Sequence, residues 1–100
     1  MEKLTIKIRE KDGLKEVYAK PFELVDWLTT YINRDSVTDY WNITEFRSGL
    51  QLGSGRIQKE AKDRALKNIE KKGQAWVLKE IETYVAKNGE ANKKEQETLL

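Results

Sequence analysis

The sequence predicts an α+β fold in which a four-stranded antiparallel sheet, made of two hairpins, packs with about three helices. Two segments, 3–20 and 40–53, show the alternation of apolar and polar residues that is typical of half-buried strands. Three further segments, near 22–33, 56–72 and 74–88, carry apolar residues at helical spacing. The expected order of elements is β-β-α-β-β-α-α, which is typical of a sheet with helices on one face.

The first hairpin is predicted from a turn signal between two alternating segments. Asp12-Gly13 is a dipeptide that favours tight hairpin turns, and apolar side chains alternate with polar ones before and after it. The side chains expected to face the core are Leu4, Ile6, Ile8, Val17 and Ala19.

The second hairpin is predicted over 40–46 and 50–52, and both faces of its first strand are partly apolar. We favour Trp41 and Ile43 as the buried pair, which leaves Tyr40 and Phe46 facing outward; the sequence does not decide between the two faces. A glycine-rich stretch, 49–55, then precedes a helix. Bound phosphate at the helix start is one interpretation. A turn followed by a helix cap at Ser54 is the favoured one, because the Gly-Lys-Ser/Thr of a Walker loop is absent.

The three predicted helices have recognisable limits. Pro21 suits the first turn of the helix near 22–33. Gly73 separates the other two, and Asn88-Gly89 ends the last one. We therefore expect one domain over 1–89 and a disordered polar tail over 90–100. The core is expected to contain Ile6, Ile8, Val17, Leu28, Ile57, Ala61, Ile69, Leu78 and Ile81.

The composition excludes several kinds of chemistry. The chain has neither cysteine nor histidine, which removes thiol nucleophiles, Cys/His zinc sites and imidazole acid–base catalysis. The carboxylates form no pair with an evident shared task. We therefore expect a protein that is not an enzyme and that needs neither a metal nor a cofactor.

The charge pattern and the chain start predict a cytoplasmic protein that does not enter a membrane. The formal net charge is only +2. The first nine residues are charged throughout, unlike a secretory signal, and no apolar run reaches the roughly 18 residues of a membrane span.

Nucleic-acid binding is the second of two expected functions. The predicted helix 56–72 holds seven basic and three acidic residues, although Glu60–Arg64 and Asp63–Lys67 have the spacing of ordinary surface ion pairs. The outer face of the sheet would add aromatic and cationic side chains, a combination that can stack bases and hold phosphates. The candidates are Lys7, Arg9, Tyr18, Lys20, Tyr40, Phe46, Arg56, Lys59, Lys67 and Lys71.

Protein recognition is the leading expectation. Trp76 lies opposite the apolar face of the last helix, among Lys79, Glu80 and Thr83, and tryptophan is enriched at binding hot spots. The alternative is that Gly73 bends the chain and the indole covers an edge of the core. The expected partner is another protein, and self-association stays open.

Overall fold

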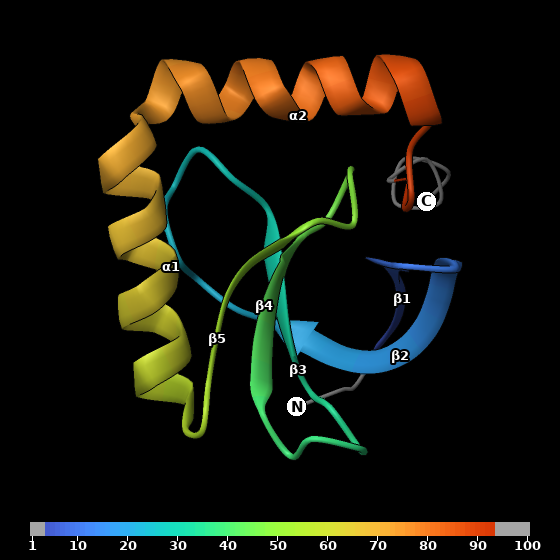
Figure 1. The fold of residues 1–100 in the computed structure, drawn as a ribbon, viewed down its shortest axis with the longest axis vertical. Helices are drawn as coiled ribbons and strands as arrows, with labels where there is room; N and C mark the ends of the chain where they lie inside the picture. Colours follow the sequence, from blue (N-terminus) through green and yellow to red (C-terminus); the bar gives the residue numbers. More distant parts are fainter. Residues whose placement is uncertain (1–3, 94–100) are drawn as a thin grey trace, which may run out of the picture.

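The computed structural model describes residues 4–93, in which five strands precede two helices. The sheet is an antiparallel meander in the order β1-β2-β3-β4-β5. Figure 1 shows α1 beside β5 and α2 running across one end of the sheet. The elements are β1 (Leu4–Glu10), β2 (Gly13–Pro21), β3 (Thr30–Arg34), β4 (Trp41–Glu45), β5 (Gln51–Gly55), α1 (Gln58–Lys72) and α2 (Gln74–Asn88). The α+β class and both predicted hairpins are confirmed, with five strands in place of four and two helices in place of three.

The helix predicted over 22–33 is wrong. Thr30–Arg34 is strand β3, paired with β2 on one side and β4 on the other. Neighbouring residues of this strand serve opposite faces of the sheet, since Tyr31 joins one apolar cluster and Ile32 joins another. A helix would have kept both on one side. Burial on two faces, together with β-branched residues, therefore favours the strand.

An apolar cluster lies on each face of the sheet. The helix-side cluster contains Leu24, Ile32, Ile43, Ala61, Ala65, Ile69, Val77 and Ile81. The opposite cluster contains Ile6, Ile8, Ala19, Tyr31 and Phe46. Strand β2 curves strongly, so that the first hairpin folds over the second face (Figure 1). The Arg9 N–H donates to Gly49 O at 2.8 Å and ties β1 to the β4–β5 turn.

The face of β4 is settled by these two clusters. Ile43 is buried toward the helices and Trp41 packs against the same cluster, as predicted. The expected exposure of Phe46 is wrong, because its ring is buried against Tyr31, with ring centroids 5.3 Å apart. The first hairpin covers a face that the sequence alone left exposed to solvent.

The glycines of β5 allow α1 to approach the strand. A Cβ atom on Gly53 would lie 2.6 Å from the Ala65 backbone nitrogen, and one on Gly55 would lie 2.7 Å from the Ala61 nitrogen. Both distances are shorter than any ordinary contact. The stretch 53–55 is therefore part of a strand that contacts a helix, and it is not a flexible helix cap.

The predicted core is correct in part. Ile6, Ile8, Ala61, Ile69 and Ile81 are buried, and Val17 and Leu28 are partly buried. Two expectations are wrong. Ile57 is 60% exposed because α1 begins after it, with Ile57 as an N-cap that makes no side-chain capping bond. Leu78 is 37% exposed, because only Val77 and Ile81 of α2 face the core fully.

Two arginines fasten the end of α2 to the sheet. The Arg9 side chain donates from Nε to Ser48 O at 3.0 Å and from Nη2 to Gly89 O at 2.8 Å. Arg47 pairs with Glu82 and Glu90 across the same junction.

The chain after α2 continues against β1. Residues 90–93, which we assigned to the tail, include a buried Ala91. Asn92 exchanges 2.8 Å hydrogen bonds with the backbone of Lys7. The rest of the predicted tail, 94–100, lies outside the described residues.

Candidate functional site

Two basic residues of α1 form ordinary ion pairs along the helix. Arg56, Lys59, Lys67 and Lys71 are exposed. Lys59 pairs with Asp63 at 3.0 Å, and Arg64 lies 3.5 Å from Glu60 as predicted. Asp63 thus finds its partner one turn before the expected Lys67. Such exposed pairs contribute little stability and are typical of a solvated helix face.

The residues predicted for the outer face of the sheet fall into two groups. Some have a role in the packing of the fold, and others are exposed. Phe46 belongs to the second core cluster, and the Arg9 guanidinium lies 5.1 Å from the Tyr84 ring centroid while it holds the end of α2. Lys7 is exposed. Tyr40 lies beside Arg56, and its hydroxyl raises the pKa of that guanidinium. Tyr18 and Lys20 remain on an open part of the sheet.

The open part of the sheet exists because β2 diverges from β3. Their pairing covers only Lys20 with Ile32 and Pro21 with Tyr31, so the preceding residues of β2 separate from β3. Helix α1 packs on β4 and β5 and leaves this region uncovered. The result is a pocket of about 340 Å³ lined by Tyr18, Ala19, Lys20, Ile32, Asn33, Arg34 and Trp41.

Two aromatic and two cationic side chains frame this pocket. Tyr18 is 74% exposed, and Lys20 follows on the same face of β2. The Arg34 guanidinium carbon lies 5.7 Å from the Trp41 ring centroid. Sequence reasoning missed Arg34 because it placed this residue after a helix. A strand over 30–34 would have put Arg34 on the same face as Ile32.

The β3–β4 loop fixes the position of Arg34. Asp39 accepts two hydrogen-bonded contacts from the guanidinium, at 3.0 Å from Nε and 3.0 Å from Nη2. Asp35 organises the loop, since its carboxylate accepts the N–H groups of Thr38 at 3.0 Å and Val37 at 2.7 Å. These two backbone bonds lower the pKa of Asp35. Asp39 therefore positions the Arg34 guanidinium beside the Trp41 ring.

Asn33 is a buried polar residue between the diverging strands. It is 5% exposed, and its Oδ1 is the one buried side-chain oxygen or nitrogen, among the described residues, without a hydrogen-bond partner. It lines the pocket described above and a second pocket, of about 250 Å³, on the other side of the gap between β2 and β3. An unsatisfied buried acceptor costs about 1–3 kcal/mol.

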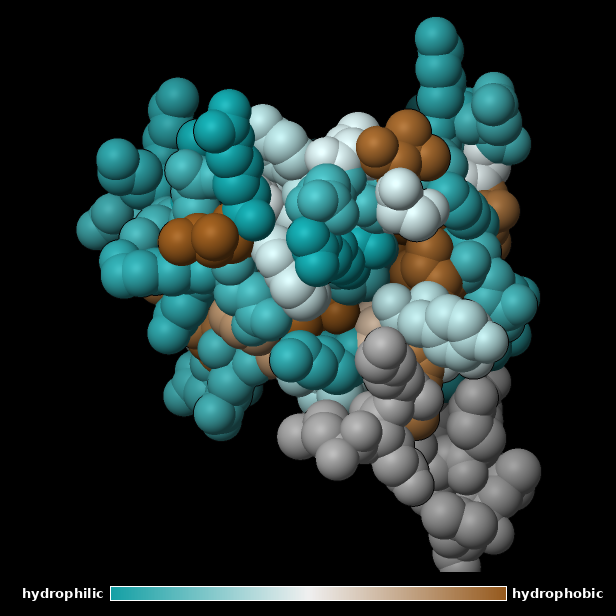
Figure 2. All heavy atoms as spheres, turned by 90° about the horizontal axis from the view of Figure 1, so that it is seen from below, coloured by the Kyte–Doolittle hydropathy of each residue, from teal (hydrophilic) through white to brown (hydrophobic). Residues whose placement is uncertain are grey.

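The face of the molecule seen from below is mostly hydrophilic (Figure 2). Figure 2 shows this face dominated by hydrophilic side chains, with the most hydrophobic ones in separate spots rather than in one continuous patch.

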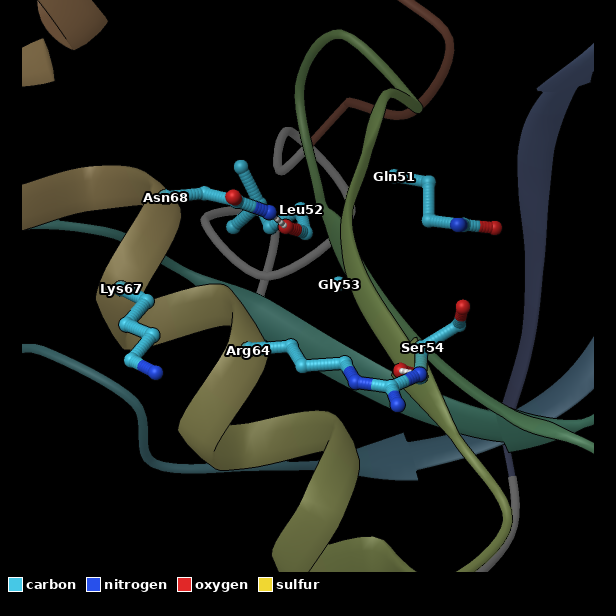
Figure 3. A pocket seen from close by; sticks show the side chains of 7 residues that line it. All are labelled: Gln51, Leu52, Gly53, Ser54, Arg64, Lys67 and Asn68. Atoms are coloured by element: carbon cyan, nitrogen blue, oxygen red, sulfur yellow. Dashed lines mark hydrogen bonds between the residues drawn. The ribbon is translucent and has the colours of Figure 1, made fainter. Parts of the chain in front are cut away.

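Two side chains of α1 that line the pocket between α1 and β5 are hydrogen-bonded to the strand. It encloses about 310 Å³ beside the edge strand. Figure 3 shows Arg64 and Asn68 extending from α1 to this strand. Arg64 Nη1 donates to Ser54 O at 3.2 Å, and Asn68 Nδ2 donates to Leu52 O at 2.8 Å. Side chains of the helix therefore cap the carbonyls at this edge of the sheet.

The predicted protein-recognition residues lie together on an exposed side of α2. Trp76 is 45% exposed, and Lys79, Glu80 and Thr83 are exposed near it. The Lys72 ammonium lies 4.6 Å from the Trp76 ring centroid, so a cation of the protein itself covers part of the indole. The exposure agrees with the sequence analysis, and the role in binding stays a prediction.

Other kinds of site find no support in the part of the chain that the structure describes. Residues 4–93 contain no group of three acidic, histidine or cysteine side chains placed to hold a metal ion. Within the same residues, neither helix has the length and apolar character needed to cross a membrane. Comparison with protein-family models, curated proteins and solved structures found no match.

Proposed function

We propose that this protein is a non-enzymatic module that binds single-stranded nucleic acid on the open face of β2, β3 and β4. The observation that carries the proposal is the pocket framed by Tyr18, Lys20, Arg34 and Trp41. Aromatic side chains stack on bases of any sequence, and neighbouring cations contact the phosphates.

The shape of the pocket favours a single strand over a duplex. An unpaired base can leave its neighbours and enter a concave site, whereas the bases of a duplex stay stacked and paired. The two walls also differ in kind. Tyr18 presents an exposed ring on β2, whereas Trp41 lies partly buried beneath Arg34 on β4. Such walls can hold a base between an aromatic ring and a cation.

A binding measurement with matched variants tests this proposal. The probe is a fluorescently labelled DNA strand of about ten nucleotides, titrated with protein at about 50 and 200 mM salt. Tyr18→Ala should weaken binding by about 1–3 kcal/mol, the usual loss for one stacked base. Lys20→Gln should weaken binding and flatten the salt dependence, because one counterion fewer is released.

Lys62→Gln is the matched control, because it removes the same charge from an exposed position on α1 that does not line the pocket. It should leave the affinity within about twofold of the wild type, as expected for a charge that contacts no phosphate. Undetectable binding at low salt, or wild-type affinity in Tyr18→Ala, would exclude this face as a nucleic-acid site.

Protein recognition through Trp76 is our second proposal. It is supported by the half-exposed indole and by the polar, exposed residues around it on α2. If Trp76 lies at an interface, Trp76→Ala should leave the melting temperature nearly unchanged. The same change should abolish recovery of a partner protein in a pull-down from nuclease-treated lysate. At a core edge, the same change should instead lower stability by about 3–5 kcal/mol.

A further inference from the structure

We infer that the β2–β3 pocket, framed by Tyr18, Lys20, Arg34 and Trp41, binds the phosphorylated end of a single strand more tightly than an unphosphorylated end. This inference rests on the proposed function and names the part of the strand that the site takes. It starts from the two cations of the pocket and from the donors that each of them still offers to a ligand.

Arg34 keeps one edge of its guanidinium free. Its Nε and Nη2 atoms contact the two carboxylate oxygens of Asp39, each at 3.0 Å. Nη1 makes no hydrogen bond within residues 4–93, and the side chain is 55% exposed. A guanidinium carries five N–H donors, so the edge formed by Nη1 and Nη2 can bind two oxygens of an anion while Asp39 holds the other edge.

Lys20 is the second cation of the pocket. Its ammonium forms neither an ion pair nor a hydrogen bond with any other residue in the described part of the chain. Lys20 pairs with Ile32, so it lies diagonally from Arg34 on the neighbouring strand and on the same face. Diagonal neighbours in an antiparallel pair are about 7–8 Å apart, a distance that long side chains can span. Lys20 and Arg34 can therefore contact the same anion.

The two cations together offer more donors than an internal phosphate can accept. An internal phosphate diester has two free oxygens and a single negative charge. A terminal phosphate has three free oxygens and a charge of about −1.5 to −2 at neutral pH. Two of these oxygens can accept from the Arg34 edge while the third accepts from Lys20. No carboxylate lines the pocket to oppose that charge.

The rest of the pocket suits the nucleotide that bears this phosphate. Ile32 and Trp41 supply apolar and aromatic surface for a base, and the Tyr18 ring is 74% exposed at the rim. The volume of about 340 Å³ is near the lower limit for small-ligand sites, which leaves room for one nucleotide rather than several. A single terminal nucleotide therefore matches the pocket in both charge and size.

The experiment compares three strands that differ only at their ends. Each is an oligothymidine of about ten nucleotides, with a 5′-phosphate, a 3′-phosphate or no terminal phosphate. The unlabelled strands compete with a labelled strand for the wild-type protein. One phosphorylated strand should bind about tenfold more tightly than the unphosphorylated one, the usual value of a hydrogen bond to a charged group. The strand that gains affinity identifies which end enters the pocket.

Variants of Lys20 test whether the preference arises in this pocket. Lys20→Gln should remove most of the tenfold preference, and Lys20→Arg should keep it, because arginine restores the charge and the donors. Lys62→Gln removes the same charge from α1, away from the pocket lining, and should keep the preference. All three variants should melt like the wild type. The comparison of strands on wild-type protein does not depend on any variant folding.

The outcomes distinguish this inference from the proposed function. Salt-dependent binding with equal affinity for all three strands would overturn the preference for a phosphorylated end and leave nucleic-acid binding in place. A preference that persists undiminished in Lys20→Gln would overturn it as well. Binding to none of the strands would overturn the proposed function itself.

Thymidine monophosphate serves as a further arm, because a free nucleotide carries the same phosphate and base as the end of a strand. The phosphorylated strand should bind at least about tenfold more tightly, since its further bases and phosphates also contact the protein. Equal affinity would assign the pocket to a free nucleotide and overturn the inference for a strand end.

Discussion

The two sides of the central sheet differ in how completely the protein satisfies its own groups. At the β5 side, α1 lies against glycines, and Arg64 and Asn68 cap the strand carbonyls. At the β2–β3 side, the strands diverge, Tyr18 is exposed and Asn33 Oδ1 has no partner. Both sides contain pockets of similar volume, about 310 and 340 Å³. Volume therefore does not indicate which side binds a ligand.

The difference shows that the volume of a pocket and the pairing of the groups around it are separate properties. The β5 pocket is a consequence of close helix packing, and a ligand there would have to displace hydrogen bonds already made. The β2–β3 pocket offers two rings and two cations. Substitutions on the first side should change stability, and substitutions on the second should change binding, so variants on each side should affect different measurements.

The largest effect is expected at Gly53, on the closed side. Gly53→Ala places a Cβ atom 2.6 Å from the Ala65 backbone nitrogen, and a helix backbone cannot move aside easily. The free energy of unfolding in urea should fall by about 1–3 kcal/mol or more, the usual cost of overpacking. The affinity of the folded protein for single-stranded DNA should not change.

Ser54→Ala is the neighbouring control on β5, and it should change stability by no more than about 0.5–1 kcal/mol. A comparably small loss for Gly53→Ala would mean that α1 does not pack on β5 as closely as described here.

An intermediate effect is expected from uncapping the β5 edge. The double variant Arg64→Ala, Asn68→Ala removes both side-chain donors, so the Leu52 and Ser54 carbonyls face solvent. Stability should fall by about 0.5–1.5 kcal/mol for each lost bond. An exposed edge strand also pairs readily with a second copy. Sedimentation velocity should therefore show stronger self-association than in the wild type.

Lys67→Ala serves as the control for this variant, because Lys67 lines the same pocket from the same helix. It should sediment like the wild type. Unchanged self-association in the double variant would show that the two caps do not protect this edge.

The smallest effect is expected on the open side, at Asp39. Asp39→Asn removes the carboxylate that holds Arg34, while asparagine tolerates the positive φ of 68° at this position. The freed guanidinium should bind phosphate better, by about 0.2–1 kcal/mol, and the salt dependence should steepen by about one counterion.

Asp63→Asn makes the same change in an ion pair on α1, and it should not alter the affinity for single-stranded DNA. Weaker binding in Asp39→Asn would instead mean that Arg34 acts only while Asp39 positions it above Trp41.

Local patterns predicted the elements whose apolar residues all face one way. The first hairpin follows from alternation around Asp12-Gly13, and α2 follows from helical spacing between Gly73 and Gly89. Alternation along the same hairpin also identifies Tyr18 and Lys20 as outward-facing candidates. The sequence does not identify Arg34 and Asn33 as candidates, because the apolar spacing over 22–33 predicts a helix where the structure has strand β3.

The sequence by itself determined the α+β class, the antiparallel hairpins and the two C-terminal helices, because each depends on residues close together in the chain. Only the tertiary structure decided that 30–34 is a strand, because both of its faces are buried by segments distant in sequence. It also decided that the β5 glycines are contact points, since that role exists only when α1 lies against them. The open pocket has the same origin: β2 curves to cover the second face of the sheet, and its separation from β3 leaves Asn33 without a partner.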